Sequence, residues 1–371
     1  MCRRVFTYTF VLTFVIALAH VPTASAASLY TQTNLTSDIP GMAANLDANL
    51  KNPWGMSFGA SSPFWVSNQV SNNATLYNGA GAPQMLVVST PPSPTGQVFN
   101  GTADFEVGPG QPARFIFASL SGTVSGWNPM ASPTSALVEY TAPDGAVYTG
   151  LASGNTGGNN FLYAADSLNG KIDVLNSLFD KVSPSGSFTD PDVPSGFTPY
   201  NIQNVGGDKL YVTYSIRESP GGYVAVFDLN GNLLQHFTDP HLEEPWGVTL
   251  APAGFGSFGG ALLIGNEGDG RINAFNPTTG AFLGTLSSAS GPIENEGLWA
   301  IKFRAADSGF DPNALYFAAG INDEENGLFG TITLAPVPEP ATVWSGMLTL
   351  GALAFAAWRR KQKSRNRGTA A

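Results

Sequence analysis

The segment 52–58 reads NPWGMSF, and it recurs as EPWGVTL at 244–250 and, more loosely, as GLWAIKF at 297–303. Each copy is followed by a turn-rich stretch and then by a second apolar strand, which reads PFWVS, ALLIG or ALYFA. A third short strand follows each of these. Repetition of the same strand-turn-strand pattern indicates one supersecondary unit that is copied along the chain.

Weaker copies of the unit fill the space between the clear ones. The second strands fall at 63–67, 113–117, 160–164, 209–213, 261–265 and 314–318. Their starts are 50, 47, 49, 52 and 53 residues apart. Such a period, with three or four short strands per unit, is typical of a β-propeller blade, whereas a solenoid needs shorter and more regular repeats. We therefore predict an all-β fold, a six-bladed β-propeller that occupies residues 27–336.

The ring of blades must also be closed, because each blade buries its faces only against its neighbours. The natural pair for closure is a strand at 29–33 beside a strand at 328–334. We expect the N-terminus of the body to complete the last blade in this way.

The composition supports a folded, turn-rich β protein. Of 371 residues, 43 are Gly and 27 are Pro, while charged residues make up 12% and hydrophobic residues 43%. That apolar content is too high for a disordered chain. The formal net charge is −10, and nine basic against 26 acidic residues give the body 27–336 a charge of −17. Binding to phosphates needs clustered Lys and Arg, so the charge argues against nucleic acid as a partner.

The N-terminus has the pattern of a secretory signal peptide, which we assign to residues 1–26. Arg3 and Arg4 precede an apolar run at 5–19, which is too short for a stable membrane span. The small residues that a signal peptidase accepts follow as Ala24, Ser25 and Ala26. The single cysteine, Cys2, leaves with this segment, so the sequence excludes an intrachain disulfide and a Cys-ligated zinc.

The C-terminal segment 337–371 combines a short motif, an apolar run and a basic tail. The motif is Val337, Pro338, Glu339 and Pro340. The run at 341–358 has 18 residues, which as a helix would extend about 27 Å, enough to cross a bilayer core. The tail 359–371 begins with the basic cluster Arg359, Arg360, Lys361 and Lys363. This cluster would hold the end of a transmembrane helix in the cytoplasm and leave the body outside.

This order of motif, apolar helix and basic tail resembles the PEP-CTERM sorting signal of exported bacterial proteins. The resemblance implies passage through the secretion machinery, recognition by a membrane-embedded exosortase, and cleavage at the Pro-Glu-Pro element. It also implies a protein that is first anchored in the membrane and then delivered to the cell surface or an extracellular matrix. An ordinary C-terminal anchor helix is the alternative.

The Pro-Trp-Gly and Asn-Gly elements of the body resemble those of NHL-repeat and gluconolactonase-like six-bladed propellers. Together with both terminal signals, the chain is similar to a family of uncharacterised exported bacterial propeller proteins, for which no activity is established. Gluconolactonase-like propellers bind a divalent metal through Glu, Asp and Asn at the channel. Their Glu-Gly-Pro and Pro-Asn-Gly signatures are not reproduced here.

Three polar residues precede repeat strands at equivalent or neighbouring places. Asn52 and Glu244 lie two residues before a tryptophan, and Glu296 lies three before Trp299. In a propeller these loops open at one end of the central channel, so their oxygen atoms would converge there. Such oxygens, without imidazole or thiolate, suit Ca²⁺ better than a transition metal. The sequence thus gives Ca²⁺ as a candidate cofactor, while ordinary acidic loop residues are the alternative.

Other motifs have structural explanations. The segment 55–59 matches G-x-S-x-G, but it lies in a repeat strand and lacks the strand-to-helix turn of a nucleophile elbow. His236 and His241 are the histidines of the body, and we expect surface or turn positions for both. The segments 266–270 and 322–327 are rich in Asn, Asp and Gly, which indicates hairpin turns. We expect the tryptophans to pack between blades, namely Trp54, Trp65, Trp127, Trp246 and Trp299.

The sequence contains no convincing set of acid, base and nucleophile, so no catalytic residue is predicted. It favours an exported, surface- or matrix-displayed binding or scaffold module over an enzyme. Extracellular polysaccharide and surface proteins are both candidate partners. The alternative is a Ca²⁺-dependent hydrolase of the lactonase type that uses Asn52, Glu244 and Glu296 as metal ligands.

Overall fold

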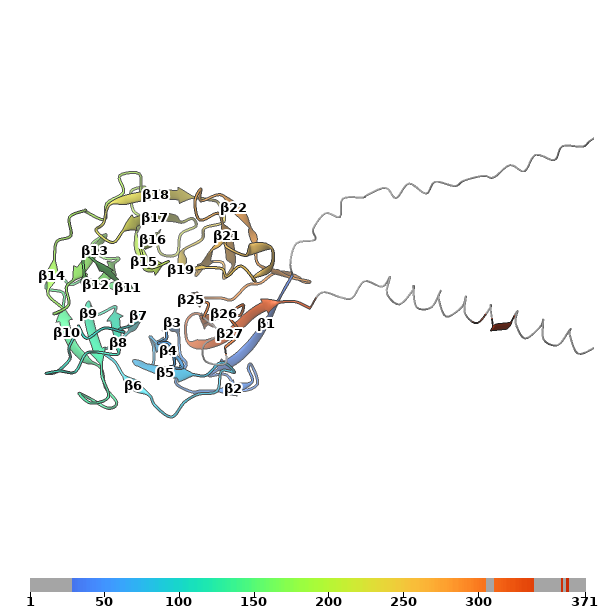
Figure 1. The fold of residues 1–371 in the computed structure, drawn as a ribbon, viewed down its shortest axis with the longest axis horizontal. Helices are drawn as coiled ribbons and strands as arrows, with labels where there is room; N and C mark the ends of the chain where they lie inside the picture. The colour runs from blue at the N-terminus through green and yellow to red at the C-terminus, as the bar shows by residue number, and fades with distance from the viewer. Residues whose placement is uncertain (1–28, 305–309, 337–354, 356–357, 360–371) are drawn as a thin grey trace, which may run out of the picture.

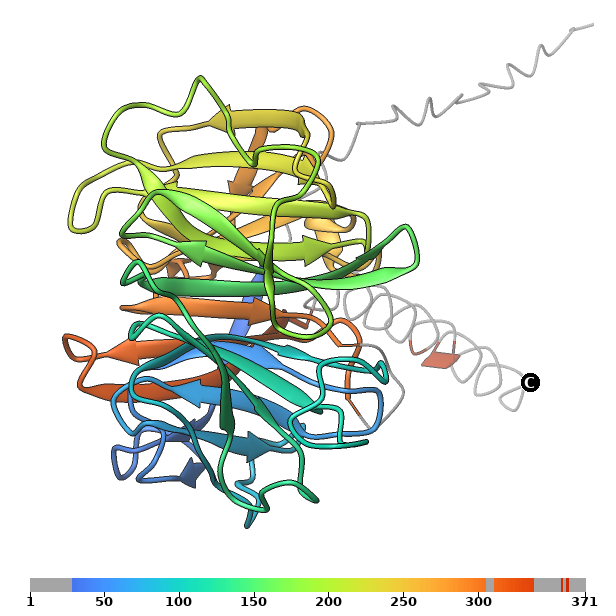
Figure 2. The same ribbon diagram turned by 90° about the vertical axis from the view of Figure 1, so that its left-hand side faces the viewer.

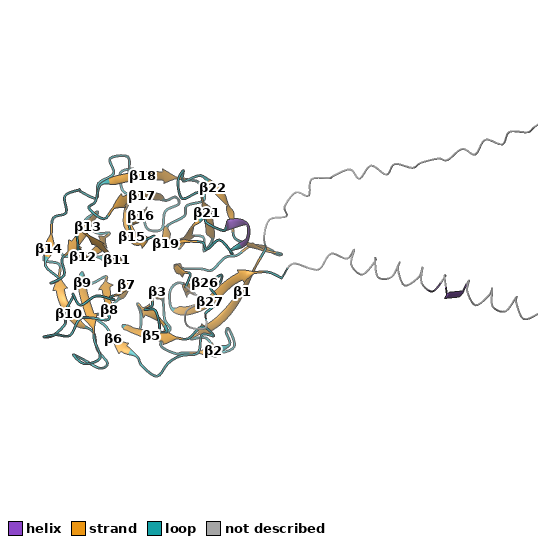
Figure 3. Ribbon diagram, in the orientation of Figure 1, coloured by secondary structure: helices purple, strands orange, loops and turns teal. Residues whose placement is uncertain are grey.

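The computed structural model describes residues 29–304, 310–336, 355 and 358–359. The described residues between 29 and 336 form six β-sheets arranged around a central axis (Figure 1), antiparallel except for one short parallel pair in the last, which confirms the predicted six-bladed propeller. Figure 3 shows that this body consists of strands and loops with a single short 3₁₀-helix, η1 (Gly256–Phe258). The predicted signal peptide and nearly all of the segment 337–371 lie outside the described residues.

Blades one to five are four-stranded sheets whose strands follow one another from the axis outwards. Blade one contains β3 (Pro53–Ser57), β4 (Phe64–Asn68), β5 (Asn73–Tyr77) and β6 (Val88–Ser89). Blade two contains β7 (Pro94–Phe99), β8 (Phe115–Ser119), β9 (Thr123–Trp127) and β10 (Leu137–Thr141). Blade three contains β11 (Tyr148–Thr156), β12 (Asn159–Asp166), β13 (Lys171–Leu175) and β14 (Lys181–Val182).

Blade four contains β15 (Thr198–Val205), β16 (Lys209–Ser215), β17 (Tyr223–Asp228) and β18 (Leu233–Thr238). Blade five contains β19 (Pro245–Leu250), β20 (Leu262–Asn266), β21 (Ile272–Phe275) and β22 (Phe282–Thr285). A small hairpin of β23 (Ser287–Ser288) and β24 (Gly291–Pro292) leads into blade six. In the side view of Figure 2 the strands run between the two faces of the ring.

Blade six joins the two ends of the body. It contains β25 (Leu298–Lys302), β26 (Leu315–Ile321) and β27 (Asn326–Leu334), and then β1 (Tyr30–Ser37) and β2 (Asn45–Leu46). The antiparallel register of β1 and β27 places Tyr30 opposite Leu334 and Ser37 opposite Leu328. The Tyr30 hydroxyl also donates a hydrogen bond of 3.0 Å to the Phe255 carbonyl of blade five. The predicted closure by the N-terminus is therefore confirmed.

The inner strands approach one another so closely at the axis that a side chain would not fit. A Cβ atom on Gly55 would lie 2.3 Å from the Thr95 carbonyl of blade two, and one on Gly96 would lie 2.3 Å from the Leu151 amide of blade three. On Gly247 it would lie 2.5 Å from the Trp299 carbonyl. The glycine of the repeated Pro-Trp-Gly motif is thus required by the approach of the next blade.

The pairing of each inner strand with its second strand also shifts register at this motif. The shift occurs between the following pairs: Pro53 and Met56, Pro94 and Gln97, Tyr148 and Gly150, Pro199 and Asn201, Pro245 and Gly247, and Leu298 and Ile301. Such bulges bend a strand and re-aim its side chains. They allow the strands to turn toward the axis while the blades remain paired.

The contacts at Gly55 give a test of the close approach. Gly55→Ala should lower the free energy of unfolding by about 1–3 kcal/mol, because the added methyl overlaps backbone of blade two. Gly108→Ala is the matched control, since its Cβ would make only ordinary contacts at 3.7 Å and beyond. Urea unfolding of both variants measures the difference. Equal stability of the two would contradict the packing described for the axis.

Candidate functional site

Aromatic rings from the inner strands close the channel near one of its ends. Trp54 stacks on Trp299 with ring centroids 3.7 Å apart, and Trp246 meets both of these rings edge-on. Tyr200 packs against Trp299 from blade four. Trp246 donates its indole hydrogen bond across the axis to the Thr149 carbonyl, at 3.2 Å. These rings form a floor beneath the loops at that end.

Trp65 and Trp127 have the position that the sequence predicts for all five tryptophans. They pack with Phe115 in the interface between blades one and two. The three at the axis also join neighbouring blades, but they do so within the channel rather than between the sheet faces.

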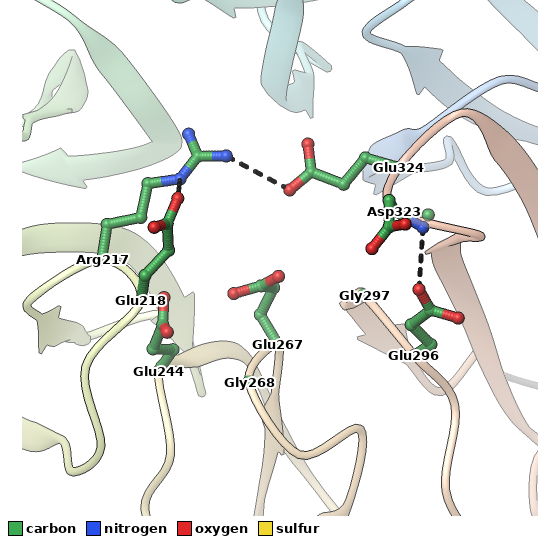
Figure 4. A pocket seen from close by; sticks show the side chains of 10 residues that line it. Arg217, Glu218, Glu244, Glu267, Gly268, Glu296, Gly297, Asp323 and Glu324 are labelled. Carbon is green, nitrogen blue, oxygen red and sulfur yellow. Dashed lines mark hydrogen bonds and ion pairs between the residues drawn. The ribbon is translucent and has the colours of Figure 1, made fainter.

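Above one half of this floor lies a cavity of about 470 Å³, which we call the acidic mouth. Its lining comes from blades four, five and six: Arg217, Glu218, Glu244, Glu267, Gly268, Glu296, Gly297, Gly320, Asp323 and Glu324 (Figure 4). Among these described residues six carry a carboxyl group and one carries a guanidinium. A strongly negative potential at this end of the channel follows from that balance.

The up-and-down order of the strands explains why these residues meet. The loop before an inner strand and the loop after a second strand lie at the same end of a blade. Glu244 directly precedes β19, and Glu267 directly follows β20. Glu296 lies just before β25, and Glu324 lies in the turn between β26 and β27. Blades five and six therefore each deliver two loops to the mouth.

Glu324 is held in place by contacts with two other blades. Its Oε1 lies 3.4 Å from Nη2 of Arg217 in blade four, and its Oε2 accepts a hydrogen bond of 2.8 Å from Nδ2 of Asn52 in blade one. Arg217 also approaches Glu218 at 4.0 Å, and the backbone amide of Asp323 donates to Glu296 at 2.8 Å (Figure 4). The rim of the mouth is thus a connected set of charged contacts.

Glu244 and Glu267 are the carboxyl groups with the least favourable surroundings. Glu244 is 7% exposed, its Oε2 is buried with no hydrogen-bond partner, and its backbone is left-handed with φ 49°. Burial raises the pKa of Glu244. Burial, together with the charges of Glu244 and Glu324, raises the pKa of Glu267 to about 8. Glu267 therefore holds a proton at neutral pH and shares a side-chain hydrogen bond with Glu244, whose buried Oε2 has no amide, hydroxyl or cationic partner among the described residues.

The predicted site residues divide into two groups. Glu244 and Glu296 line the acidic mouth, as their sequence positions suggest. Asn52 is fully buried at its edge, where its Oδ1 accepts the Trp299 indole hydrogen bond at 2.9 Å. Its Nδ2 donates to Gln69 and Glu324. Asn52 therefore joins the aromatic floor to the charged rim.

Sequence reasoning missed Glu267 and Glu324, because both lie in segments that turn chemistry already explains. The three consecutive left-handed residues Asn322, Asp323 and Glu324 do form a tight turn. The overlooked signal was topological: an antiparallel blade places the turn after its second strand beside the loop before its first. That rule predicts that both glutamates lie at the mouth.

The other half of the same channel end is much less polar. A cavity of about 280 Å³ there is lined by Trp54, Leu120, Val147, Leu168 and Tyr200, with hydroxyl side chains between them. Arg217 lines both cavities. This end of the channel thus offers an apolar surface directly beside the acidic mouth.

Two further acidic groups lie away from the axis, and each already has cationic or hydrogen-bonding partners. Asp190 accepts from Tyr223 at 2.9 Å and lies 3.0 Å from Nδ1 of His236. His241 stacks on Phe282 with centroids 3.7 Å apart. The second group is Asp144, Asp166 and Asp173, which surround Lys171 and Lys181. Both histidines therefore have structural contacts in outer strands or loops.

Comparison with known sequences confirms the resemblance of the C-terminal segment. The PEP-CTERM protein-sorting motif matches residues 336–361. This motif marks the protein for export and sorting by an exosortase. In the described part of the chain no helix has the length and apolar character to cross a membrane. The predicted transmembrane helix at 341–358 falls almost wholly outside that part.

Two similar sequences come from Acanthamoeba polyphaga mimivirus. The uncharacterised protein R648 is 32% identical over 328 residues, which cover 80% of this chain and 78% of R648. The uncharacterised protein L690 is 30% identical over 318 residues, which cover 78% and 82% of the two chains. The similarity thus extends over most of each protein, and neither name carries an activity.

Several solved structures share the fold at low sequence identity. A streptogramin B lyase superposes with a TM-score of 0.51 and 12% identity, over 82% of this chain and 97% of the lyase. Virginiamycin B lyase from Staphylococcus aureus gives 0.50 and 13%, over 82% and 99%. A protein of unknown function from Bacteroides thetaiotaomicron gives 0.53 and 13%, over 82% and 76%. These likenesses concern the propeller fold.

The raised pKa of Glu267 predicts a pH-dependent effect on stability. Between its ordinary value of 4.5 and about 8, the folded protein holds a proton that the unfolded chain has released. Stability should therefore fall as pH rises through this range. Glu267→Gln removes the effect, so the variant should gain about 4 kcal/mol over the parent protein at pH 8 and about 1 kcal/mol at pH 5.

Thermal unfolding at both pH values measures this difference. Glu325→Gln is the control, because it removes the same charge from an exposed position near the mouth. A gain for Glu267→Gln that is the same at pH 5 and pH 8 would show that the carboxyl group does not hold its proton as described.

Proposed function

The chain belongs to the same protein family as mimivirus R648 and L690, and we propose that this member is an exported binding module whose acidic mouth holds a cation. The PEP-CTERM motif supports display at the cell surface or in an extracellular matrix. One observation carries the binding proposal: the buried Oε2 of Glu244 has no amide, hydroxyl or cationic partner among the described residues, and it belongs to a cavity with six carboxyl groups and a single arginine among those residues.

Ca²⁺ is the ion that fits this lining. The described residues of the mouth offer carboxylate and backbone oxygens and neither imidazole nor thiolate, which is the donor set of a hard cation. The described carboxylates of the mouth do not gather three oxygens within 4.8 Å of one another. Water would therefore complete the coordination, and we expect weak binding, with a Kd of roughly 10⁻⁴–10⁻³ M as in extracellular modules.

We assign the ligand roles from the contacts of each side chain. Glu244 contributes its unpartnered oxygen, and Glu267 contributes a carboxylate after loss of its proton. Glu296 lies on the opposite side of the cavity in Figure 4 and completes the predicted set. We give Asn52 a positioning role, because its amide is already hydrogen-bonded to Trp299 and Glu324.

The apolar half of the channel end favours a carbohydrate as the larger ligand. Paired hydroxyl groups of a sugar are oxygen donors that a partly hydrated Ca²⁺ accepts. The face of the same sugar ring is apolar and suits the cavity beside Trp54 and Tyr200. Extracellular polysaccharide is therefore the partner that we propose ahead of a surface protein.

Calcium titration of residues 27–336 by calorimetry tests the cation site. We expect one saturable binding event that becomes tighter from pH 6.5 to pH 8.5, because binding must displace the proton of Glu267. Glu244→Gln should weaken binding at least about tenfold. The control Glu325→Gln should bind nearly as the parent protein does. Absence of saturable heat, or unchanged binding by Glu244→Gln, would refute the site.

The pair Glu244 and Glu267 also favours a second function, a Ca²⁺-dependent hydrolase of the lactonase type. Two neighbouring carboxyl groups with different proton affinities suit general acid–base catalysis. Glu267 keeps its proton at neutral pH and would act as the acid, while a cation beside Glu244 would polarise the substrate carbonyl.

An assay of glucono-δ-lactone hydrolysis separates the two functions. Hydrolysis is monitored through the protons that it releases in a weakly buffered solution. The hydrolase predicts turnover that requires Ca²⁺ and falls at least about a hundredfold in Glu267→Ala. Calcium binding without turnover would leave the binding module as the function of the site.

A further inference from the structure

The opposite end of the channel has a cavity of a different character. It is formed where the inner strands end, and its volume is about 330 Å³. Its lining is Met56, Ser57, Phe58, Gln97, Val98, Phe99, Ser153, Gln203, Asn204, Gly207 and Lys302. We call it the lysine cavity. Blades one, two, three, four and six contribute to it, and the aromatic floor at the other end separates it from the acidic mouth.

Lys302 is the last residue of β25 and is paired in register with Tyr316. Within the described residues its amine makes neither a hydrogen bond nor an ion pair. The other half-buried lysines among the described residues have carboxylate partners: Lys51 lies 2.9 Å from Asp38, and Lys171 lies 3.4 Å from Asp173. Lys302 thus lines the cavity, and its amine has no counterion among the described residues.

The neighbouring polar groups do not supply a partner. Gln97 donates to the carbonyls of Gly55 and Trp65, and its Oε1 accepts from Ser57. Asn204 donates to the Ser153 carbonyl. The Gln203 amide is the one side-chain amide of the described lining that makes no such bond. No other described residue of this cavity carries an ionisable side chain.

An amine in such surroundings loses its proton easily. Burial, with no opposing charge, lowers the pKa of Lys302 to about 7. About half of these amines are therefore unprotonated at neutral pH, whereas an ordinary lysine with a pKa of about 10.4 is almost fully protonated. An unprotonated amine is a nucleophile, and desolvation is a known way of activating a lysine for attack on carbonyl compounds.

We propose that Lys302 is a nucleophilic amine that captures small aldehydes or ketones, including open-chain sugars, as a Schiff base in the lysine cavity. The Nζ lone pair adds to the carbonyl carbon, and a proton moves from nitrogen to the carbonyl oxygen. Loss of that oxygen as water, with the second amine proton, leaves the carbon–nitrogen double bond. The step needs no oxidant or reductant. Gln203 lines the same cavity, and its free amide would donate a hydrogen bond to the oxygen that leaves.

A bound anion is the competing explanation for a lone lysine, and the lining argues against it. An anion site needs a permanent positive charge and several free donors. Here half of the amines are uncharged at neutral pH, and most of the amide donors are already used. The proposal is independent of the cation site, because no residue lines both cavities.

Reductive trapping tests the proposal on the body 27–336, whose ring closes without the terminal segments. The protein is treated with glycolaldehyde and cyanoborohydride at pH 7, and labelled lysines are identified by peptide mass spectrometry. Lys302 should be labelled at least about tenfold faster than the exposed Lys209, because a far larger fraction of its amine is neutral. As the pH is lowered, the rate at which Lys302 is labelled should fall near pH 7 to half of its value at high pH.

Two variants separate reactivity from folding. Lys302→Arg should lose this label, while Lys209→Arg should leave labelling of Lys302 unchanged. Gln203→Glu keeps the lysine and adds a carboxylate to the cavity wall. It should slow labelling of Lys302 at pH 7 about tenfold and move its pH profile upward. Circular dichroism confirms that each variant is folded.

Equal labelling of Lys302 and Lys209 at pH 7 would overturn the proposal. It would also be overturned if inorganic phosphate bound in a manner dependent on Lys302 while glycolaldehyde did not label this residue preferentially. That result would identify an anion site instead.

Discussion

The close approach of inner strands at the axis is the constraint on which the structure depends. Gly55, Gly96 and Gly247 each lie where backbone of the next blade leaves no room for a Cβ atom. Blade four has Asn201 where these blades have glycine, and the Asn201 Nδ2 donates a hydrogen bond of 2.7 Å to the Trp246 carbonyl. Blades that approach so closely leave a narrow channel, which aromatic rings then close near one end. The two ends of the channel thereby become separate chemical environments.

The same constraint decides what each end contains. Loops that enter the inner strands meet above the aromatic floor, and six described carboxyl groups lie there with one arginine. The inner strands finish at the other end, where Lys302 lies among uncharged side chains. The acidity of the body is thus unevenly distributed along its own axis. Opposite chemistry at two ends of one channel follows from the direction in which every inner strand runs.

The repeat predicted much of the fold, because second strands are buried on both faces and therefore read as short apolar runs. The predicted runs at 63–67 and 160–164 fall on β4 and β12, for example. The inner strands of blades two, three and four were missed, since they read PTG, YTG and PYN where the clear copies have PWG or LWA. The property shared by the six is a bulge in the pairing of the inner strand, which does not require tryptophan.

The site was less predictable than the fold. Glu244 and Glu296 follow from their position before repeat strands, but the contacts of Asn52 arise only when the first and last blades meet. Lys302 is visible in the third copy of the motif. Its isolation from every carboxylate depends on neighbours that are distant in sequence, so no local pattern reveals it.

The closure of blade six has a mechanical consequence for an exported protein that carries a sorting motif after its last strand. Strand β27, from which the chain continues toward the sorting motif, is not an edge strand but lies between β26 and β1. A pull on the chain beyond Leu334 would load two ladders of hydrogen bonds in shear at the same time, rather than peeling one strand from the sheet. The ring would thereby resist tension at the point where it is tethered.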